Sequence, residues 1–242
     1  MSWKFGLRMA AGLMLLTAGA LVMLLAAALT LFQARRFYSE WIATPLGKAM
    51  LAVWGVRYVE HDRARIPRGQ VIYVSNHTST IDMFVLIALG LPNTRFFLSG
   101  YLRKLIPLGV IGYLIGIFWT VDQVYPERRK RIFARAARLL KRSGESVYLS
   151  PEGERVTTGK IGSFNKGAFH MATDLKAPIV PLFITIPRAM DPGLGLDAGP
   201  GVVHVHFLPA IDTSGWRVEQ VPVNRDRVRE MFTGWHAELH AS

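Results

Sequence analysis

The chain has 242 residues, enough for one catalytic domain of ordinary size with an additional segment. Half of the residues are apolar, so the chain is too hydrophobic to be disordered and part of it is expected to contact lipid. The formal net charge of +12 indicates an anionic partner, which nucleic acid, an anionic membrane or a phosphorylated substrate would each satisfy. With no cysteine, disulfides, thiolate nucleophiles and cysteine-bound zinc are excluded.

The N-terminal segment contains an uncharged run from Met9 to Phe32 with basic residues on both sides. At about 1.5 Å per residue, such a helix crosses a hydrocarbon core of roughly 30 Å, so we expect a retained membrane anchor. A cleaved signal peptide is the alternative, although its apolar core usually has only about 7–15 residues. Because the flanking charges are balanced, they do not fix the orientation, and a half-inserted helix pair stays open. We expect the inner membrane, with the catalytic domain on its cytoplasmic face.

Residues 37–56 are mildly apolar and carry Tyr38, Trp41 and Trp54. Aromatic rings of this kind favour the membrane–water boundary, although an ordinary core helix fits the pattern equally well. We therefore expect residues 1–60 to form a membrane anchor with an interfacial helix, and residues 61–242 to form the catalytic domain.

Short β-branched runs alternate with helical patterns after residue 61. Strands are predicted at residues 71–75, 95–98, 117–121, 146–150, 179–186 and 202–208, and helices at 79–89, 126–142, 166–175 and 224–240. This alternation predicts an α/β fold in which a mixed central sheet is flanked by helices, beside the N-terminal membrane-associated helical segment. The apolar stretch 105–121 would bound an acyl-chain channel, contact the membrane or, most simply, belong to the core.

A candidate proton-transfer pair, His77 and Asp82, follows the predicted strand 71–75. The histidine would lie in the turn after the strand, and the carboxylate in the first turn of the next helix. A carboxylate that accepts a hydrogen bond from one imidazole nitrogen leaves the other nitrogen free to take a proton from a hydroxyl. However, Ser79 and Asp82 also fit a helix-capping arrangement, and the spacing of the pair arises readily by chance. The pair alone is therefore a weak indication of function.

A second motif, from Pro151 to Arg155, follows the predicted strand 146–150, and a third, from Phe164 to Gly167, opens the next predicted helix. Gly153 permits close approach of the backbone to a ligand, and Arg155 offers a planar fork suited to phosphate. A helix N-terminus favours an anion, and Lys166 adds positive charge there. An ordinary solvated turn is the alternative. Because ligands bind at the carboxyl ends of strands in open α/β sheets, the motifs are expected to share one cleft.

Taken in order, these three motifs resemble those of the phospholipid-synthesis acyltransferase family, whose bacterial members acylate 1-acyl-glycerol-3-phosphate. The resemblance covers about residues 70–190, and residues 177–181 look like the family's fourth block. It implies that His77 is the base and Asp82 its orienting partner, and that Arg155 and Lys166 surround the phosphate of the acceptor. It also implies an acceptor-binding role for the other motif residues, which are Asn76, Glu152, Gly153 and Gly167.

Several positions depart from the family pattern. Ser150 stands where an aromatic residue is usual, and Glu154 where threonine is usual. The basic residue that normally ends the strand after the family's Ile-Pro-x-x-Gly block falls near Asp122. The family's upstream lysine is also missing, so Arg103 or Lys104 is expected to substitute for it. These differences concern the acceptor head group more than acyl transfer, and another lysolipid, such as a lyso-aminolipid, stays a candidate acceptor.

We therefore expect an O-acyltransferase that moves a fatty acyl group from acyl-CoA or an acyl carrier protein to the free hydroxyl of a lysophospholipid. The most direct case converts 1-acyl-glycerol-3-phosphate to phosphatidic acid at an anionic membrane surface. The sequence contains neither a Gly-x-Ser-x-Gly elbow nor a cysteine to hold a covalent intermediate, so a single direct transfer is expected. No metal-ligand cluster is visible in the sequence, and no cofactor beyond the thioester co-substrate is expected.

Two other functions remain open at this point. In residues 127–142, eight Lys and Arg stand against one Glu, which would suit a membrane-anchored nucleic-acid binder. The apolar residues of the same segment form a core-facing stripe, and anionic lipid explains the charge equally well, so we expect no nucleic-acid partner. A catalytically silent lipid-binding relative is the third reading, and the intact His77 and Asp82 argue against it.

Overall fold

In the computed structural model, residues 3–191 and 198–240 are described. The chain begins with the long helix α1 (Trp3–Leu29), and a short α2 (Arg35–Phe37) and a π-helical turn η1 (Tyr38–Ala43) lead into α3 (Thr44–Val53). The later helices are α4 (Asp82–Ala88), α5 (Ile106–Leu114), α6 (Pro126–Ser143), α7 (Gly167–Leu175) and α8 (Val221–His240). Short 3₁₀ turns lie at η2 (Arg63–Arg65), η3 (Leu102–Lys104) and η4 (Val218–Gln220).

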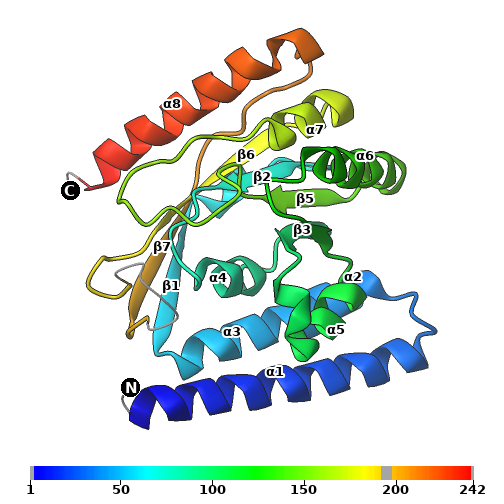
Figure 1. Cartoon of the computed structure of the whole chain (residues 1–242), viewed down its shortest axis with the longest axis vertical. Coiled ribbons are helices and arrows are strands. Elements are labelled where there is room, and N and C mark those ends of the chain that lie inside the picture. Colours follow the sequence, from blue (N-terminus) through cyan, green and yellow to red (C-terminus); the bar gives the residue numbers. More distant parts are fainter. Residues whose placement is uncertain (1–2, 192–197, 241–242) are drawn as a thin grey trace.

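Seven strands form one mixed sheet, so the predicted fold class is confirmed (Figure 1). The strands are β1 (Val56–His61), β2 (Ile72–Ser75), β3 (Thr94–Ser99), β4 (Phe118–Thr120), β5 (Ser146–Leu149), β6 (Ile179–Thr185) and β7 (Gly201–Phe207). Their order across the sheet is β1-β7-β6-β2-β5-β3-β4, and every neighbouring pair is parallel except β6 and β7. The carboxyl ends of β2 and β5 therefore lie side by side, and the first two motifs follow those two strands.

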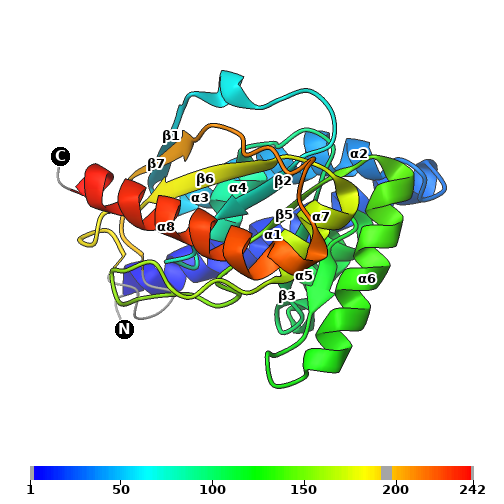
Figure 2. The same cartoon turned by 90° about the horizontal axis from the view of Figure 1, so that it is seen from above.

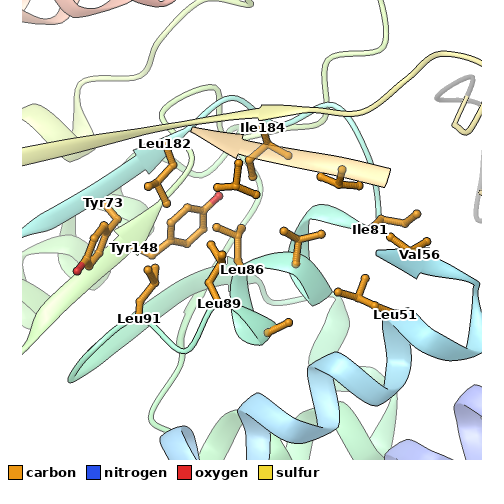
Figure 3. Packing of buried hydrophobic residues seen from close by; sticks show 14 of the residues in the cluster. Leu51, Val56, Tyr73, Ile81, Leu86, Leu89, Leu91, Tyr148, Leu182 and Ile184 are labelled. Atoms are coloured by element: carbon orange, nitrogen blue, oxygen red, sulfur yellow. The ribbon is translucent and has the colours of Figure 1, made fainter. Parts of the chain in front are cut away.

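Alternating side chains of the strands build a core on each face of the sheet, because successive residues of a strand point to opposite faces. On one face, Tyr73 and Tyr148 pack with apolar residues of α3 and α4 (Figure 3). On the other face, Ile72 and Val147 pack with α6, α7 and α8. The central strands are buried on both faces, which explains why they read as nearly continuous apolar runs.

The helix α1 lies along the outside of the α3–α4 layer rather than extending away from the domain (Figure 1). Its inward face packs on η1, α3 and α5 in a third apolar cluster, and Met23 and Ala27 are fully buried there. Gly19 allows this close approach, because a Cβ at this position would lie 2.6 Å from a methyl group of Leu46. Its outward face carries exposed Leu, Val and Met side chains. By length and composition, α1 is the one helix of the described residues that qualifies as a membrane span.

The predicted strands and helices of the catalytic region are all present, with ends shifted by a few residues. Two elements were missed: β1 falls across the expected domain boundary at residue 60, and α5 lies within the apolar stretch 105–121. The helix predicted from Ser79 begins only at Asp82, because the preceding residues form a loop whose main-chain amides bind the Asp82 carboxylate. That loop carries the first motif.

Candidate active site

His77 and Asp82 form a hydrogen-bonded pair at the carboxyl end of β2. The imidazole Nδ1 lies 2.8 Å from Oδ2 of Asp82. The same carboxylate oxygen accepts main-chain hydrogen bonds from Thr78 at 2.9 Å and from Ser79 at 3.0 Å. Asp82 is thus held rigidly by the loop that presents the histidine, and a rigid partner fixes both the tautomer and the direction of the ring.

The two side chains of the pair differ in exposure. The Asp82 side chain is 2 % exposed and that of His77 is 31 % exposed, so the ring alone reaches solvent. Within residues 3–191 and 198–240, the imidazole Nε2 has no hydrogen-bond partner, and neither has the buried Oδ1 of Asp82. With Nδ1–H donated to Asp82, Nε2 is a free acceptor. A buried carboxylate beside the ring also stabilises the imidazolium that forms when Nε2 takes a proton.

The buried carboxylate of Glu152 binds the main chain of the loop that carries His77. It is 3 % exposed, and its two carboxylate oxygens accept main-chain hydrogen bonds from His77 at 2.6 Å and Gly162 at 2.8 Å. Burial raises the pKa of this carboxyl, and the two amide donors partly oppose the shift. The main chain of Val156 also donates to the His77 carbonyl at 2.8 Å. The second motif therefore holds the first motif in position, and Glu152 itself is covered by protein.

Asn76 and Gly153 have conformational reasons for their identities. The Asn76 side chain is buried and exchanges two hydrogen bonds of 2.8 Å with the main chain of Ile184, which ties the end of β2 to β6. Gly153 has a φ of 74°, a conformation that side chains rarely tolerate, and a Cβ there would lie 2.7 Å from Asn165. Asn165 in turn donates to the Glu152 carbonyl at 2.9 Å. Both predicted binding residues thus shape the loop around His77.

An open cleft of about 590 Å³ lies in front of His77 and is also lined by Arg155. Arg155 donates to the Thr80 hydroxyl at 2.8 Å, so it is anchored just before α4. Gly153, Glu154 and Asp122 also line this cleft. Four of the predicted site residues therefore line one space despite their separation in the sequence: His77, Asp82, Gly153 and Arg155.

Lys166, Gly167 and Arg103 lie outside the walls of the His77 cleft. Lys166 and Gly167 line a neighbouring hollow of about 710 Å³ between α6 and α7. A Cβ at Gly167 would lie 2.6 Å from the Phe133 ring, so the glycine lets α7 approach α6. Arg103 is exposed in the 3₁₀ turn η3, next to Leu102, which does line the His77 cleft. The predicted convergence is thus seen for Arg155 and not for these three residues.

Arg129 of α6 was not singled out from the sequence, yet it lines both the His77 cleft and the Lys166 hollow. Its guanidinium donates to the Val121 carbonyl at 3.1 Å, and its Nη2 is 3.7 Å from the Cβ position of Gly153. Burial lowers the pKa of this guanidinium, and Asp122 partly opposes the shift. In the sequence, Arg129 is one of several consecutive basic residues and carries no distinguishing signal. Packing of α6 alone turns it inward.

A narrow apolar pocket of about 40 Å³ adjoins the cleft, between α1, α3, α4 and α5. Its walls are apolar throughout, and Met83, Leu98 and Leu102 line both the pocket and the cleft. Residues 105–121 supply part of the lining and also buried core residues, which confirms the core interpretation of this stretch, and an acyl-chain channel stays a prediction. Among the described residues, no group of three or more His, Asp or Glu side chains is arranged to hold a metal ion.

The region that carries the site matches a known protein family. The family model described as Acyltransferase matches residues 56–185, which span β1 to β6 and include both motifs of the His77 cleft. This chain belongs to the acyltransferase family. The match begins at residue 56, the first residue of β1, and β1 pairs with β7 in the same sheet as the motif-bearing strands.

Relatives of this acyltransferase include human 1-acyl-sn-glycerol-3-phosphate acyltransferase beta, 29% identical over 170 residues, covering 70% of this chain and 61% of that protein. The 1-acyl-sn-glycerol-3-phosphate acyltransferase of Limnanthes alba is 27% identical over 183 residues, covering 73% and 62%. The chain thus spans about six tenths of the length of these relatives. The crystal structure of the 1-acyl-sn-glycerophosphate (LPA) acyltransferase PlsC from Thermotoga maritima has the same fold, with a TM-score of 0.73, 22% identity and coverage of 97% and 98%.

Proposed function

We propose that this acyltransferase moves a fatty acyl group from a thioester to the free hydroxyl of a lysophospholipid, most directly 1-acyl-glycerol-3-phosphate. The observation that carries the proposal is the free Nε2 of His77, whose ring is held by a hydrogen bond from Nδ1 to Asp82. The ring lines a cleft that Arg155 also lines and that adjoins an apolar pocket. The names of the relatives support the same substrate class. The proposal assigns the acceptor hydroxyl to His77, the acceptor head group to the arginines of the cleft, and the acyl chain to the apolar pocket.

In the proposed reaction, Nε2 of His77 takes the hydroxyl proton as the acceptor oxygen attacks the thioester carbonyl. The C–O bond forms, the C–S bond breaks, and the thiolate that leaves receives a proton from the imidazolium. Asp82 keeps Nδ1 protonated and stabilises the transient positive charge. Proton transfer by the His77–Asp82 pair as a whole is expected to contribute about 10²–10⁴-fold in rate. The acyl group passes directly between the two substrates, without a covalent enzyme intermediate.

We propose that Arg155 and Arg129 hold the anionic head group of the acceptor. Both line the cleft in front of His77, and arginine binds phosphate with a planar pair of donors. Arg129 supplies a cation in the region where Asp122 replaces the basic residue of the family pattern. Lys166 adds positive charge in the adjoining hollow and is a secondary candidate.

The apolar pocket beside the cleft is the proposed site for the acyl chain of the thioester. Met83, Leu98 and Leu102, which line both the pocket and the cleft, are the proposed entrance for the chain, and the apolar walls of the pocket must separate to admit it. Burial of each methylene contributes about 0.8 kcal/mol, so a long acyl chain supplies much of the donor's affinity. The pocket also contacts α1, which links acyl binding to the helix that faces lipid.

The decisive experiment is an acyl-transfer assay with one labelled thioester and a panel of lysolipid acceptors. His77→Ala is expected to lower kcat about 10²–10⁴-fold and to leave acceptor binding intact, because it removes only the base. His61→Gln, at the far edge of the sheet, serves as the matched control. Near-native turnover of the His77 variant would refute the base assignment, and transfer to none of the acceptors by the native chain would refute the proposed function.

A further inference from the structure

The outward face of α6 carries a line of arginines, which we call the arginine stripe. It consists of Arg128, Arg131, Arg135, Arg138 and Arg142. Their spacing alternates between three and four residues, which puts all five on one side of an α-helix. All five side chains are exposed. The stripe is therefore a continuous positive surface along the whole helix.

The arginine stripe is not held in ion pairs within the described part of the chain, although Arg131 interacts electrostatically with the Glu127 carboxylate. None of its five members forms an ion pair with a described residue, whereas Lys130 on a different face pairs with Glu127 at 2.7 Å. Arg128 instead lies over the Tyr125 ring. Like charges three or four residues apart destabilise a helix by a few tenths of a kcal/mol per pair. A local cost repeated along five positions points to an anionic partner that offsets it.

The position of α6 argues against a membrane as that partner. The helix packs through Ala136 and Leu140 on the sheet face that it shares with α7 and α8. The long apolar helix α1 covers the opposite face, beyond α3 and α4 (Figures 1 and 2). When α1 rests on lipid through its exposed apolar face, α6 lies on the other face of the sheet, although Arg138 and Arg142 share a hollow with Arg95 at the sheet edge. A water-soluble acidic molecule fits this position better.

The same helix also forms part of the reaction cleft. Arg129 and Phe133, on the inner face of α6, line the space in front of His77. A partner bound to the arginine stripe is therefore only one helix thickness from the cleft. It needs a flexible extension to reach around α6 and deliver a group to His77.

We propose that the arginine stripe is the docking surface for an acidic carrier protein that holds the acyl thioester on a phosphopantetheine arm. This inference rests on the proposed function, because it names the donor of the same reaction. The carrier protein binds the stripe through its carboxylates, and its arm passes the end of α6 into the cleft. Charge pairs at the rim of such an interface act mainly on the rate of association and on its salt dependence.

The test compares two donors with the same acyl chain, one bound to an acidic carrier protein and one bound to pantetheine alone, which carries no charge. The stripe variant combines Arg131→Glu, Arg135→Glu and Arg138→Glu. The control variant makes the same change of charge at three exposed arginines elsewhere, Arg57, Arg68 and Arg227. The full-length chain is assayed in neutral detergent with one lysolipid acceptor.

We expect kcat/KM for the carrier-protein donor to fall about 10-fold or more in the stripe variant, and kcat/KM for acyl pantetheine to change less than about twofold. The control should keep native values with both donors. For the native chain, raising the salt concentration should weaken use of the carrier-protein donor alone, because exposed charges are screened. Glutamine at the same three positions gives a milder variant should the glutamates impair folding, which circular dichroism reports.

Three outcomes overturn the docking proposal. An equal loss with both donors means that the stripe acts on the fold or the acceptor, and no loss with either means that the stripe has no role in transfer. Loss of binding to anionic vesicles or nucleic acid, with carrier-protein kinetics unchanged, assigns the stripe to those partners instead. If the native chain uses neither donor, the proposed function itself fails, which is a different result from transfer that ignores the stripe.

Discussion

At the scale of single residues, Asp82 contacts the histidine rather than capping the helix from Ser79, because α4 begins at Asp82 itself and has no side-chain cap. Its carboxylate accepts hydrogen bonds from the main-chain amide of Ser79 and from Nδ1–H of His77. The loop amides thus fix the carboxylate, and the carboxylate fixes the imidazole. Asn76 and Glu152 likewise use their polar groups on main chain rather than on a ligand. Most polar groups of these motifs therefore serve to fix the position of the His77 ring.

Arg129 lines the His77 cleft, so replacing it should affect binding of the acceptor head group. Arg129→Gln should raise KM for an acceptor with a phosphate about 10- to 100-fold, since a hydrogen bond to a charged group contributes about 1.5–3 kcal/mol. It should change KM much less for an acceptor that lacks the phosphate. The measurement is initial-rate kinetics with the two acceptors and acyl pantetheine as donor. Lys141→Gln, an exposed change on the same helix, is the control. Equal effects on both acceptors would contradict a role in binding the head group.

At the scale of elements, the edge strand β1 and its parallel neighbour β7 bring three histidines together. The ring of His61 stacks on that of His206, with centroids 4.4 Å apart, and its Nε2 lies 3.0 Å from Nδ1 of His204. Burial lowers the pKa of His206 below its ordinary value of 6.5, and the neighbouring His61 and His204 lower it further, while Asp62 opposes them. The folded protein therefore favours the neutral form of His206.

This edge predicts a dependence of stability on pH. Because the pKa of His206 is lower in the folded chain than in the unfolded chain, the unfolded chain binds more protons as the pH falls below about 6.5. Stability is therefore complete above this pH and decreases below it. His206→Phe keeps a stacking ring without the charge, so its Tm should fall less between pH 7.5 and pH 5.5 than that of the native chain. Parallel decreases for the two proteins would exclude this contribution.

At the scale of the whole molecule, the exposed apolar side chains of α1 lie on one side of the sheet and the basic helix α6 on the other. The helix α1 is anchored along α3 and α5 by its inner face, so it cannot stand perpendicular to the domain surface without losing the contacts of Leu16, Ala20 and Met23. Its outer face continues into exposed Phe37 and Trp41. This arrangement favours the half-inserted alternative over a helix that crosses the bilayer, with α1 lying along one leaflet.

The chain contains no cysteine, so single cysteines can report the placement of α1. We predict that Lys4→Cys and Gln33→Cys, near the two ends of α1, both react with an impermeant maleimide from the same side of sealed vesicles. A helix that crosses the bilayer would expose them on opposite sides. Val223→Cys, exposed on α8, marks the side of the catalytic domain. Labelling of Lys4→Cys only after the vesicles are opened would contradict placement in one leaflet.

The sequence by itself determined the local structure and the chemistry that it carries. Periodicity of apolar residues predicted most strands and helices, since side chains repeat every second residue in a strand and about every 3.6 residues in a helix. The spacing of His77 and Asp82 predicted their contact, because only five positions separate them and one loop between a strand and a helix carries both. The motifs that follow β2 and β5 predicted one shared edge, since parallel neighbouring strands end together.

Only the tertiary structure decided which charged groups meet. Arg129 and Arg131 are equivalent in the sequence, and the packing of α6 turns one into the cleft and the other into solvent. Lys166 belongs to a matching motif, yet it lines the neighbouring hollow. Local patterns reflect interactions over a few residues, whereas a site is assembled from elements far apart in the chain. Their relative placement depends on how buried side chains fill the space between helices and sheet.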